Sequence, residues 1–387
     1  MSQSWDAVVV GAGPAGSATA LLLARSGARV LLLDRSRFPR DKPCSEYLSP
    51  ESTRVLARLG GGVLDAVAAA SPARLSGMKV VAPSGTGVIG RFDGFSYALP
   101  RTRFDTILRH AAETAGAEVR EGVKVEALLY DGGAVGGVAT RETGTGKRET
   151  CRARVVVGAD GLRSVVARRL GMVRTSAPRR VAFTAHVADA LGVTDVGEMH
   201  VGATGYVGLG PIGEGVTTVA LVLPLSEARR GKRFFDELNR FPGLAGRFDA
   251  RRLVRRVLAT GPFAQWSRRP VAPGGGALLV GDAADFFDPF TGQGIYSALR
   301  GAELAAACLI AGASLRTYAR ARRTEFAGKW LLERLIAVAV GWPALFERVV
   351  GRLARRPDHA DLLVRATGNC IPARAVLTPG VLARLLW

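Results

Sequence analysis

The chain has 387 residues, of which 48% are apolar, so it is long enough for two closely joined domains with a large core. Its formal net charge is +20, but only six of its 53 basic residues are lysines, and the arginines are scattered through every segment. Nucleic-acid-binding proteins concentrate such charge in a tail or stripe, so we exclude nucleic acid as the main partner; acidic cofactors or an anionic membrane surface fit the charge better.

The N-terminal segment has the pattern of a strand, a helix and a second strand. Residues 6–10 (DAVVV) form a β-branched run that predicts a buried parallel strand, and residues 29–33 (RVLLL) predict a second one. Between them, SATALLLARSG has the pattern of a helix that ends at a glycine. The sequence GAGPAG joins the first strand to this helix, and Asp34 closes the second strand. This order is typical of a dinucleotide-binding unit.

Each glycine of GAGPAG has a physical reason to be a glycine. Gly11 allows the tight turn, Gly13 lets the backbone reach a pyrophosphate, and Gly16 lets the helix pack closely on the strand. The N-terminus of the helix adds partial positive charge. Asp34, roughly 20 residues further on, is placed to accept hydrogen bonds from a ribose.

The rest of the chain alternates nucleotide-binding patterns with strands that have an antiparallel pattern. Helices are predicted over 50–60, 101–115 and near 233–240. Strands are predicted over 75–92, 95–99, 118–130, 134–139, 149–157 and 155–161, and they dominate between about 178 and 270. The segment ALLVGDAAD opens a last strand-to-helix turn, and the residues after about 315 have a helical, basic and Leu-rich pattern. This interleaving predicts one doubly wound domain with a sheet-rich domain built from its insertions.

The predicted domains are therefore discontinuous in the sequence. The nucleotide-binding domain comprises 1–72, 101–175 and 271–325, the sheet-rich substrate domain 73–100 and 176–270, and the helical C-terminal region 326–387. The four cysteines are far apart and match no metal-ligand spacing, and the N-terminus leads straight into a strand, so we expect a reduced cytoplasmic protein without a metal site. No uninterrupted apolar window of about 18 residues occurs, so we expect at most peripheral membrane contact.

Two later motifs indicate which dinucleotide is bound. GADGLRS at 158–164 and GDAADFFDPFTGQGIYSAL at 281–299, together with GAGPAG, resemble the three signatures of the FAD-dependent oxidoreductases with the p-hydroxybenzoate hydroxylase fold. That superfamily includes aromatic-ring monooxygenases, flavin-dependent halogenases and geranylgeranyl reductases. The resemblance implies FAD as cofactor and an α/β fold, in which a Rossmann-like FAD-binding domain carries an inserted mixed or antiparallel sheet domain and a helical C-terminal tail.

The resemblance also implies which residues hold FAD. Asp282 would bond the ribityl chain, and the loop and helix start after it would present backbone N–H groups to the pyrophosphate and the isoalloxazine edge. Arg103, in PRTRFDTIL, matches a family arginine that lies against the cofactor, although a plain surface role is the alternative. Asp160 would secure its loop, and the strand of Val125 would meet the adenine. The full predicted set is Gly11, Gly13, Pro14, Ala15, Gly16, Asp34, Arg35, Cys44, Arg103, Val125, Asp160, Asp282, Pro289, Gly292, Gly294 and Ile295.

The stretch KPCSEYLSP (42–50) resembles the K-P-C-G-G-x-L-S-P stretch of geranylgeranyl reductases, whose cysteine lies close to the flavin. This places the chain nearest that branch in its motifs, with a departure at 45–47, where bulky Glu46 and Tyr47 enter a loop expected to line the active site. Cys44 has three interpretations: a proton donor for alkene reduction, a covalent flavin anchor, or a small packing residue. We favour packing and leave proton donation open.

The substrate pocket is predicted from the same resemblance. TGYVGLGPIGEG (204–215) lacks the paired tryptophans of the halogenases and resembles instead the strand that faces the flavin in hydroxylases and prenyl reductases. Glu46, Tyr47, Tyr206 and Pro289 are therefore expected to line the pocket, with ordinary strand packing as the alternative for Tyr206. The four histidines are scattered and show no metal spacing.

These observations predict an FAD-dependent monooxygenase that hydroxylates a lipophilic aromatic or polyketide-like small molecule through a flavin C4a-hydroperoxide. The alternative is an FAD-dependent reductase of prenyl or enoyl double bonds. The expected reductant is NAD(P)H as a transient visitor, although no second glycine motif marks its site, or a separate reductase protein. The tail, 331–387, is expected to cap the sheet domain, with peripheral membrane contact as an addition.

Overall fold

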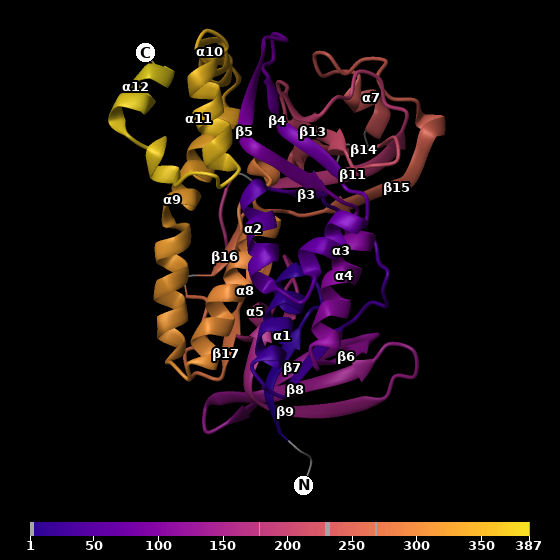
Figure 1. Ribbon diagram of the computed structural model, residues 1–387, viewed down its shortest axis with the longest axis vertical. Helices are drawn as coiled ribbons and strands as arrows, with labels where there is room; N and C mark the ends of the chain where they lie inside the picture. Colours follow the sequence, from indigo (N-terminus) through magenta and orange to yellow (C-terminus); the bar gives the residue numbers. More distant parts are fainter. Residues whose placement is uncertain (1–3, 178, 229–232, 268, 387) are drawn as a thin grey trace.

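The computed structural model describes residues 4–177, 179–228, 233–267 and 269–386 (Figure 1). Two large sheets lie at opposite ends of the molecule, and long helices run along one side of both. This confirms the predicted α/β class, with a Rossmann-like part, a second, mixed sheet and a helical C-terminal region. No helix in these described ranges is long and apolar enough to cross a membrane.

The first sheet has seven strands in the order β6-β2-β1-β9-β8-β7, and β17 also pairs with β9. Its strands are β1 (Trp5–Val10), β2 (Val30–Asp34), β6 (Glu118–Glu121), β7 (Val123–Asp131), β8 (Ala134–Glu142), β9 (Arg148–Gly158) and β17 (Ala277–Leu279). The core strands are parallel, and the side chains of β1 alternate between two hydrophobic clusters, Ala7 and Val9 in one, Val8 and Val10 in the other. Burial on both faces explains the continuous apolar runs that predicted these strands.

Helices cover the first sheet. They are α1 (Pro14–Arg25), α2 (Pro50–Leu59), α3 (Val63–Ala69), α4 (Arg101–Thr114), α5 (Val165–Arg169) and α8 (Gly294–Ile310). Helix α8 packs directly on α1. The single strand predicted over 118–130 is in fact two strands, β6 and β7. Gly122, with a φ of 71°, turns the chain between them, and this glycine inside the predicted run was the available signal.

The second sheet has eight strands in the order β15-β11-β14-β13-β12-β4-β5-β3. They are β3 (Tyr47–Leu48), β4 (Ala73–Val81), β5 (Gly87–Ala98), β11 (Arg180–Ala188), β12 (Val196–Val201), β13 (Tyr206–Pro211), β14 (Val216–Pro224) and β15 (Leu253–Thr260). All neighbours are antiparallel except β12 and β4. The predicted domain boundaries stay predictions, and β3 is a short strand that leaves the first block of sequence to join this sheet.

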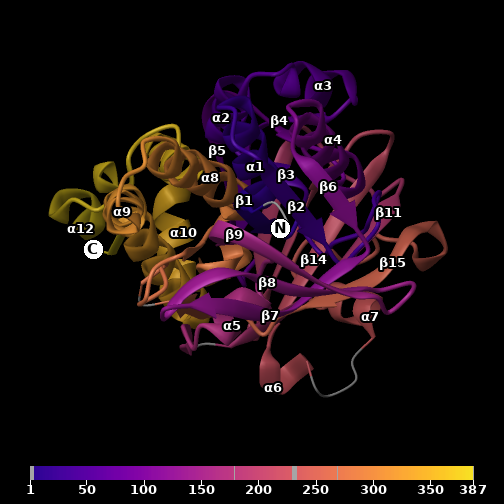
Figure 2. The same ribbon diagram turned by 90° about the horizontal axis from the view of Figure 1, so that it is seen from below.

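Short elements and the C-terminal helices complete the fold. β10 (Val173–Thr175), β16 (Gln265–Ser267) and β18 (Asp285–Phe286) form a small third sheet that the sequence did not predict. The short helices are α6 (Leu225–Ala228), α7 (Phe234–Leu238) and the 3-10 turns η1 (Ala250–Arg252), η2 (Gly281–Ala283), η3 (Pro289–Thr291) and η4 (Ala373–Ala375). The tail forms α9 (Leu315–Gly341), α10 (Pro343–Ala354), α11 (Pro357–Thr367) and α12 (Pro379–Leu386). Seen from below, α9 to α12 lie on the side of the molecule opposite to β15 (Figure 2).

Candidate active site

The N-termini of α1 and α8 open into one cavity. Gly13, Pro14 and Ala15 line it from the first helix, and Gly294 and Ile295 line it from the second. Neither helix is capped by a side-chain hydrogen bond. The backbone N–H groups of both first turns are therefore free to bind an anionic ligand, and the two helix dipoles add to the attraction.

The glycines of GAGPAG behave as their spacing predicts. Gly11 has a φ of 100°, and a Cβ on it would lie 2.6 Å from the carbonyl oxygen of Ala159. A Cβ on Gly16 would lie 1.8 Å from the carbonyl oxygen of Gly11, so only glycine fits there. A Cβ on Gly13 would meet no atom closer than 3.6 Å, the Nη2 of Arg40. Gly13 thus leaves space inside the cavity for a ligand rather than for the protein.

Two aspartates fix the loops at this end of the sheet. Asp34 is buried, and its two carboxylate oxygens accept hydrogen bonds from the N–H groups of Ala12 and Ser36, each at 2.8 Å. Each oxygen keeps a lone pair that could accept a further hydrogen bond from a ribose hydroxyl. That bond stays a prediction. Asp160 accepts a hydrogen bond from the N–H of Val165 at 2.6 Å, which holds the start of α5 as its predicted loop-securing role requires. Arg35 is exposed beside Asp34.

Asp282 and Lys42 form the charged side of the cavity. The Nζ of Lys42 lies 3.9 Å from the carboxylate of Asp282, and both residues line the cavity. Burial raises the pKa of Asp282, against the effect of the lysine charge, and burial likewise lowers the pKa of Lys42. The carboxylate of Asp282 has already lost part of its hydration in the folded protein. A polar ligand that hydrogen-bonds to it would therefore restore a lost interaction.

The loop after Asp282 is held by Asp288, which sequence reasoning missed. Asp288 accepts hydrogen bonds from the hydroxyl of Tyr206 at 2.5 Å, the N–H of Phe290 at 3.0 Å and the guanidinium of Arg180 at 2.6 Å. The loop then turns through Gly292, with a φ of 64°, into α8. Tyr206 lines the cavity, as predicted, and its hydroxyl also ties the second sheet to this loop. The aspartate inside DPFTGQG was the available signal.

Arg103 does not reach the cavity, and the prediction that it lies against the cofactor is corrected. Its side chain is 45% exposed and pairs with Glu214 at 2.7 Å. The cavity is lined instead by Arg101, which is buried and forms two hydrogen bonds with the carboxylate of Asp105, at 2.6 and 2.7 Å. The R-x-x-x-D part of the motif fits Arg101 and Asp105, which lie four residues apart on one helix face. The family arginine therefore corresponds to Arg101, two residues before Arg103.

The KPCSEYLSP loop divides its side chains between the cavity and the core. Cys44 and Tyr47 line the cavity. Glu46 does not line it, contrary to prediction. Glu46 is fully buried with a φ of 62°, and its carboxylate accepts hydrogen bonds from the N–H of Arg101 at 2.7 Å and from Arg255 at 3.2 Å. His186 lies 3.1 Å from the same carboxylate.

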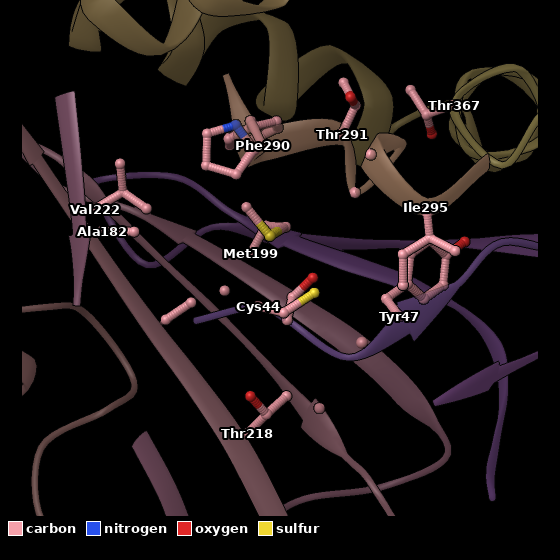
Figure 3. A pocket seen from close by; sticks show the side chains of 18 of the residues that line it. Cys44, Tyr47, Ala182, Met199, Thr218, Val222, Phe290, Thr291, Ile295 and Thr367 are labelled. Atoms are coloured by element: carbon pink, nitrogen blue, oxygen red, sulfur yellow. The ribbon is translucent and has the colours of Figure 1, made fainter. Parts of the chain in front are cut away.

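Cys44 faces the cavity as a protonated thiol. Burial raises the pKa of Cys44 above its ordinary value of 9.0, although the positive charge of Arg101 acts in the opposite direction. In Figure 3 Cys44 lies near the middle of the view, below Met199 and above Thr218 of the second sheet, and Phe290 and Thr291 lie at the top. A neutral thiol in this place can donate a proton but is a weak nucleophile.

The whole cavity has a volume of about 280 Å³. Away from the charged end its walls are mostly apolar. Its floor is the second sheet, and its other wall comes from α9, α10 and α11. The apolar side chains that line this part include Met78, Val80, Met199, Val222, Ile336, Phe346, Val350 and Val364. Val125 lies outside the cavity, buried in the core beside the parallel sheet, so its predicted meeting with adenine stays a prediction. Pro289 lines the cavity at the flavin loop.

Comparison with known proteins decides the family. The FAD binding domain family matches residues 4–325. This chain belongs to that family. The flavoprotein is 31% identical to the digeranylgeranylglycerophospholipid reductase of Methanosarcina acetivorans over 79% of this chain and 75% of the relative. It is 30% identical to the menaquinone reductase of Mycolicibacterium smegmatis over 96% of this chain and 93% of the relative.

Solved structures share the fold of this flavoprotein. The myxobacterial chondrochloren halogenase CndH matches with a TM-score of 0.77 and 25% identity, over 87% of this chain and 82% of that chain. PqsL, a probable FAD-dependent monooxygenase from Pseudomonas aeruginosa, matches with a TM-score of 0.70 and 22% identity, over 94% and 99%. Both the family and these relatives make the flavoprotein an FAD-dependent oxidoreductase.

The residues of the cavity fit FAD. Gly13 leaves space beside two uncapped helix N-termini, which suits a pyrophosphate, and the side chains of Arg40 and Arg101 lie next to that space. Asp282, a half-buried carboxylate on the same cavity, suits a ribityl hydroxyl. The turn at Gly292 and the start of α8 would hold the anionic edge of a reduced flavin. When bound and reduced, FAD supplies a hydride to a substrate beside it.

Proposed function

We propose that this flavoprotein is a reductase that adds two hydrogens to a carbon–carbon double bond of a lipophilic, prenyl-type substrate. The observation that carries the proposal is the neutral Cys44 thiol, which lies in an apolar cavity next to the residues that fit FAD. Saturating an alkene requires a hydride on one carbon and a proton on the other. Cys44 is placed to give that proton.

The conformation of Glu46 supports the reductase over the hydroxylase that the sequence favoured. The bulky Glu46 and Tyr47 would count against a reductase if both entered the pocket. Glu46 stands at the second glycine of the K-P-C-G-G-x stretch and keeps a φ of 62°, a left-handed conformation that glycine favours. Its side chain points into the core, so Glu46 does not fill the cavity, and of the two bulky residues only Tyr47 lines it.

The residues around Cys44 have defined parts in this reaction. The S–H bond of Cys44 breaks as the proton moves from Sγ to the substrate carbon, and the resulting thiolate is stabilised by the positive charge of Arg101 until it takes up a proton from water. The apolar walls exclude other water and orient the chain of the substrate. The names of two relatives, a digeranylgeranylglycerophospholipid reductase and a menaquinone reductase, support a substrate with long apolar character. NAD(P)H, or a separate reductase protein, would return electrons to the flavin.

The test is an anaerobic assay of the FAD-loaded protein with dithionite as reductant and with a menaquinone and a geranylgeranyl lipid as probes. Mass spectrometry should find a product heavier by two hydrogens. Cys44→Ser should lower turnover by roughly 100-fold or more while FAD stays bound. Because the thiol must be protonated to act, turnover of the wild type should fall only as the pH rises above 9.0, the ordinary pKa of a cysteine.

Hydroxylation is the outcome that would overturn the proposal. A product that carries one added oxygen, formed only in the presence of O₂ and retained in Cys44→Ser, would assign the protein to the monooxygenases. Thr218→Ser, a small change elsewhere on the cavity wall, serves as the matched control for packing effects. It should leave either reaction nearly unchanged.

A further inference from the structure

Helix α9 carries an apolar stripe on its exposed side. Leu331, Leu335 and Val338 are 51%, 42% and 60% exposed, and Trp342, directly after the helix, is 62% exposed. The spacings of four and three residues place Leu331, Leu335 and Val338 in one narrow row on a helix of 3.6 residues per turn, and Trp342 follows just past the end of that helix. We call these four residues the α9 stripe. Exposed large apolar side chains that gather in one row mark a contact surface more often than scattered ones do.

The other side of α9 is already used by the fold. Leu332 and Val340 are buried, and Ile336 and Ala339 line the cavity. The α9 stripe is therefore a second apolar face that the packing of the described chain does not require. The same helix thus presents one face to the substrate cavity and another to the outside.

The segment that carries the α9 stripe is strongly basic. Residues 315–356 contain ten basic and only three acidic residues. The exposed arginines of α9 and α10 in this segment include Arg320, Arg323, Arg334 and Arg348, and the exposed Arg355 and Arg356 directly follow α10. A row of Leu, Val and Trp beside arginines is the pattern of a helix that lies in the interface of an anionic membrane. A second copy of this chain would bring the same arginines against each other, which opposes self-association through this face.

We propose that the α9 stripe and its surrounding arginines dock this protein on the surface of an anionic phospholipid bilayer. The apolar side chains enter the boundary between headgroups and acyl chains, and the arginines bind the phosphates. Docking would bring α9 and α10, which also line the cavity, against the lipid phase. That a lipophilic substrate then enters from the bilayer rests on the proposed function; the docking itself does not.

The test measures binding of the full-length, FAD-loaded protein to vesicles by co-sedimentation, without substrate. Vesicles of phosphatidylcholine that contain phosphatidylglycerol should bind the protein, and vesicles of phosphatidylcholine alone should bind it much more weakly. The double variant Leu335→Asp, Val338→Asp should lower the affinity for the anionic vesicles by roughly tenfold or more, because two charges would enter the apolar boundary. Both positions are exposed, so the variant should keep the thermal stability and FAD content of the wild type.

The matched control is Leu191→Asp, Val254→Asp, in which Leu191, in the loop between β11 and β12, is 64% exposed and Val254, on β15, is 59% exposed. β15 is the edge strand of the second sheet and lies on the side of the molecule opposite to α9 (Figure 2). This control should bind the vesicles like the wild type. Equal binding by the α9 variant, loss of binding in the control instead, or equal binding to neutral vesicles would overturn the proposal. So would a concentration-dependent dimer in light scattering that the α9 variant abolishes. Membrane binding without any reductase activity would leave this proposal standing and remove the proposed function alone.

Discussion

Asp282 is the side chain on which the assignment of the cofactor can be tested most directly. It is half-buried on the cavity beside Lys42, and its loss of hydration raises its pKa. If its carboxylate bonds a ribityl hydroxyl, Asp282→Ala should weaken FAD binding by about 1.5–3 kcal/mol, the value of a hydrogen bond to a charged group. The measurement is a titration of the apoprotein with FAD, followed by flavin fluorescence.

Gly13→Val should weaken FAD binding even more, because Gly13 lines the cavity and the valine side chain would stand beside Arg40 and Arg101, where the pyrophosphate is expected to lie. Asp249→Ala, at an exposed ion pair with Arg251, is the control and should not change the titration. If Asp282→Ala and Gly13→Val both retained FAD as the wild type does, the cavity would not be the flavin site.

Arg101 and Arg103 stand two residues apart on α4 and should respond very differently to substitution. Asp105 is fully buried and has Arg101 and Arg40 as its cationic partners. Arg101→Gln removes the closer partner and should cost about 3–5 kcal/mol in the free energy of unfolding. Arg103→Gln breaks an exposed pair with Glu214 and should cost less than about 1 kcal/mol. Urea denaturation of both variants measures the difference, and equal losses would contradict the register that the structure gives to this motif.

At the scale of elements, the sequence predicted what local patterns determine. The strand runs, the glycine turn at Gly11 and the helix starts depend on neighbours in the chain, and they were found. The small third sheet depends on pairing between distant strands, which a single sequence does not record. Glu46 was misplaced for the same reason: its partners Arg255 and His186 lie 209 and 140 residues away.

The joint between β12 and the loop after α7 should give the protein an acid-sensitive element. Glu198, on β12, accepts two hydrogen bonds from Arg247, at 2.7 and 2.9 Å, and lies 2.8 Å from His200. Burial acts to raise the pKa of Glu198, but these partners outweigh it and lower the pKa from 4.5 to about 2. The stabilisation is therefore complete above pH 4.5 and is lost as the pH falls towards 2.

Glu198→Gln should accordingly lower the free energy of unfolding near neutral pH by about 3–5 kcal/mol, since it leaves the buried Arg247 without a carboxylate. The difference from the wild type should shrink as the pH falls from 4.5 towards 2. Urea denaturation across this range is the measurement. Glu126→Gln, at an exposed pair with Arg141, is the control and should change stability little at any pH. If the loss of unfolding free energy in Glu198→Gln did not change with pH, packing rather than the charge of Glu198 would stabilise this joint.

At the scale of the whole molecule, charge and apolar surface are distributed differently. The net charge of +20 is spread over the entire chain, and many arginines are engaged in local ion pairs, such as Arg58 with Glu303 and Arg365 with Asp93. The exposed apolar row on α9 is confined to one helix. Binding that depends on total charge can therefore be separated by experiment from binding that depends on the α9 stripe.

Duplex DNA makes that separation, because it offers dense negative charge without an apolar interior. The protein should bind DNA weakly and without sequence preference, and the affinity should fall steeply as salt is raised, since such binding comes from counterion release. Leu335→Asp, Val338→Asp adds two negative charges to a molecule of +20 and should change DNA affinity only slightly, while it removes most vesicle binding. Filter binding across a salt series, run beside vesicle sedimentation, measures both. Sequence-selective binding that persists at physiological salt would contradict the exclusion of nucleic acid. If the α9 variant lost affinity for DNA and for vesicles to the same extent, the change in charge rather than the apolar side chains would explain the loss.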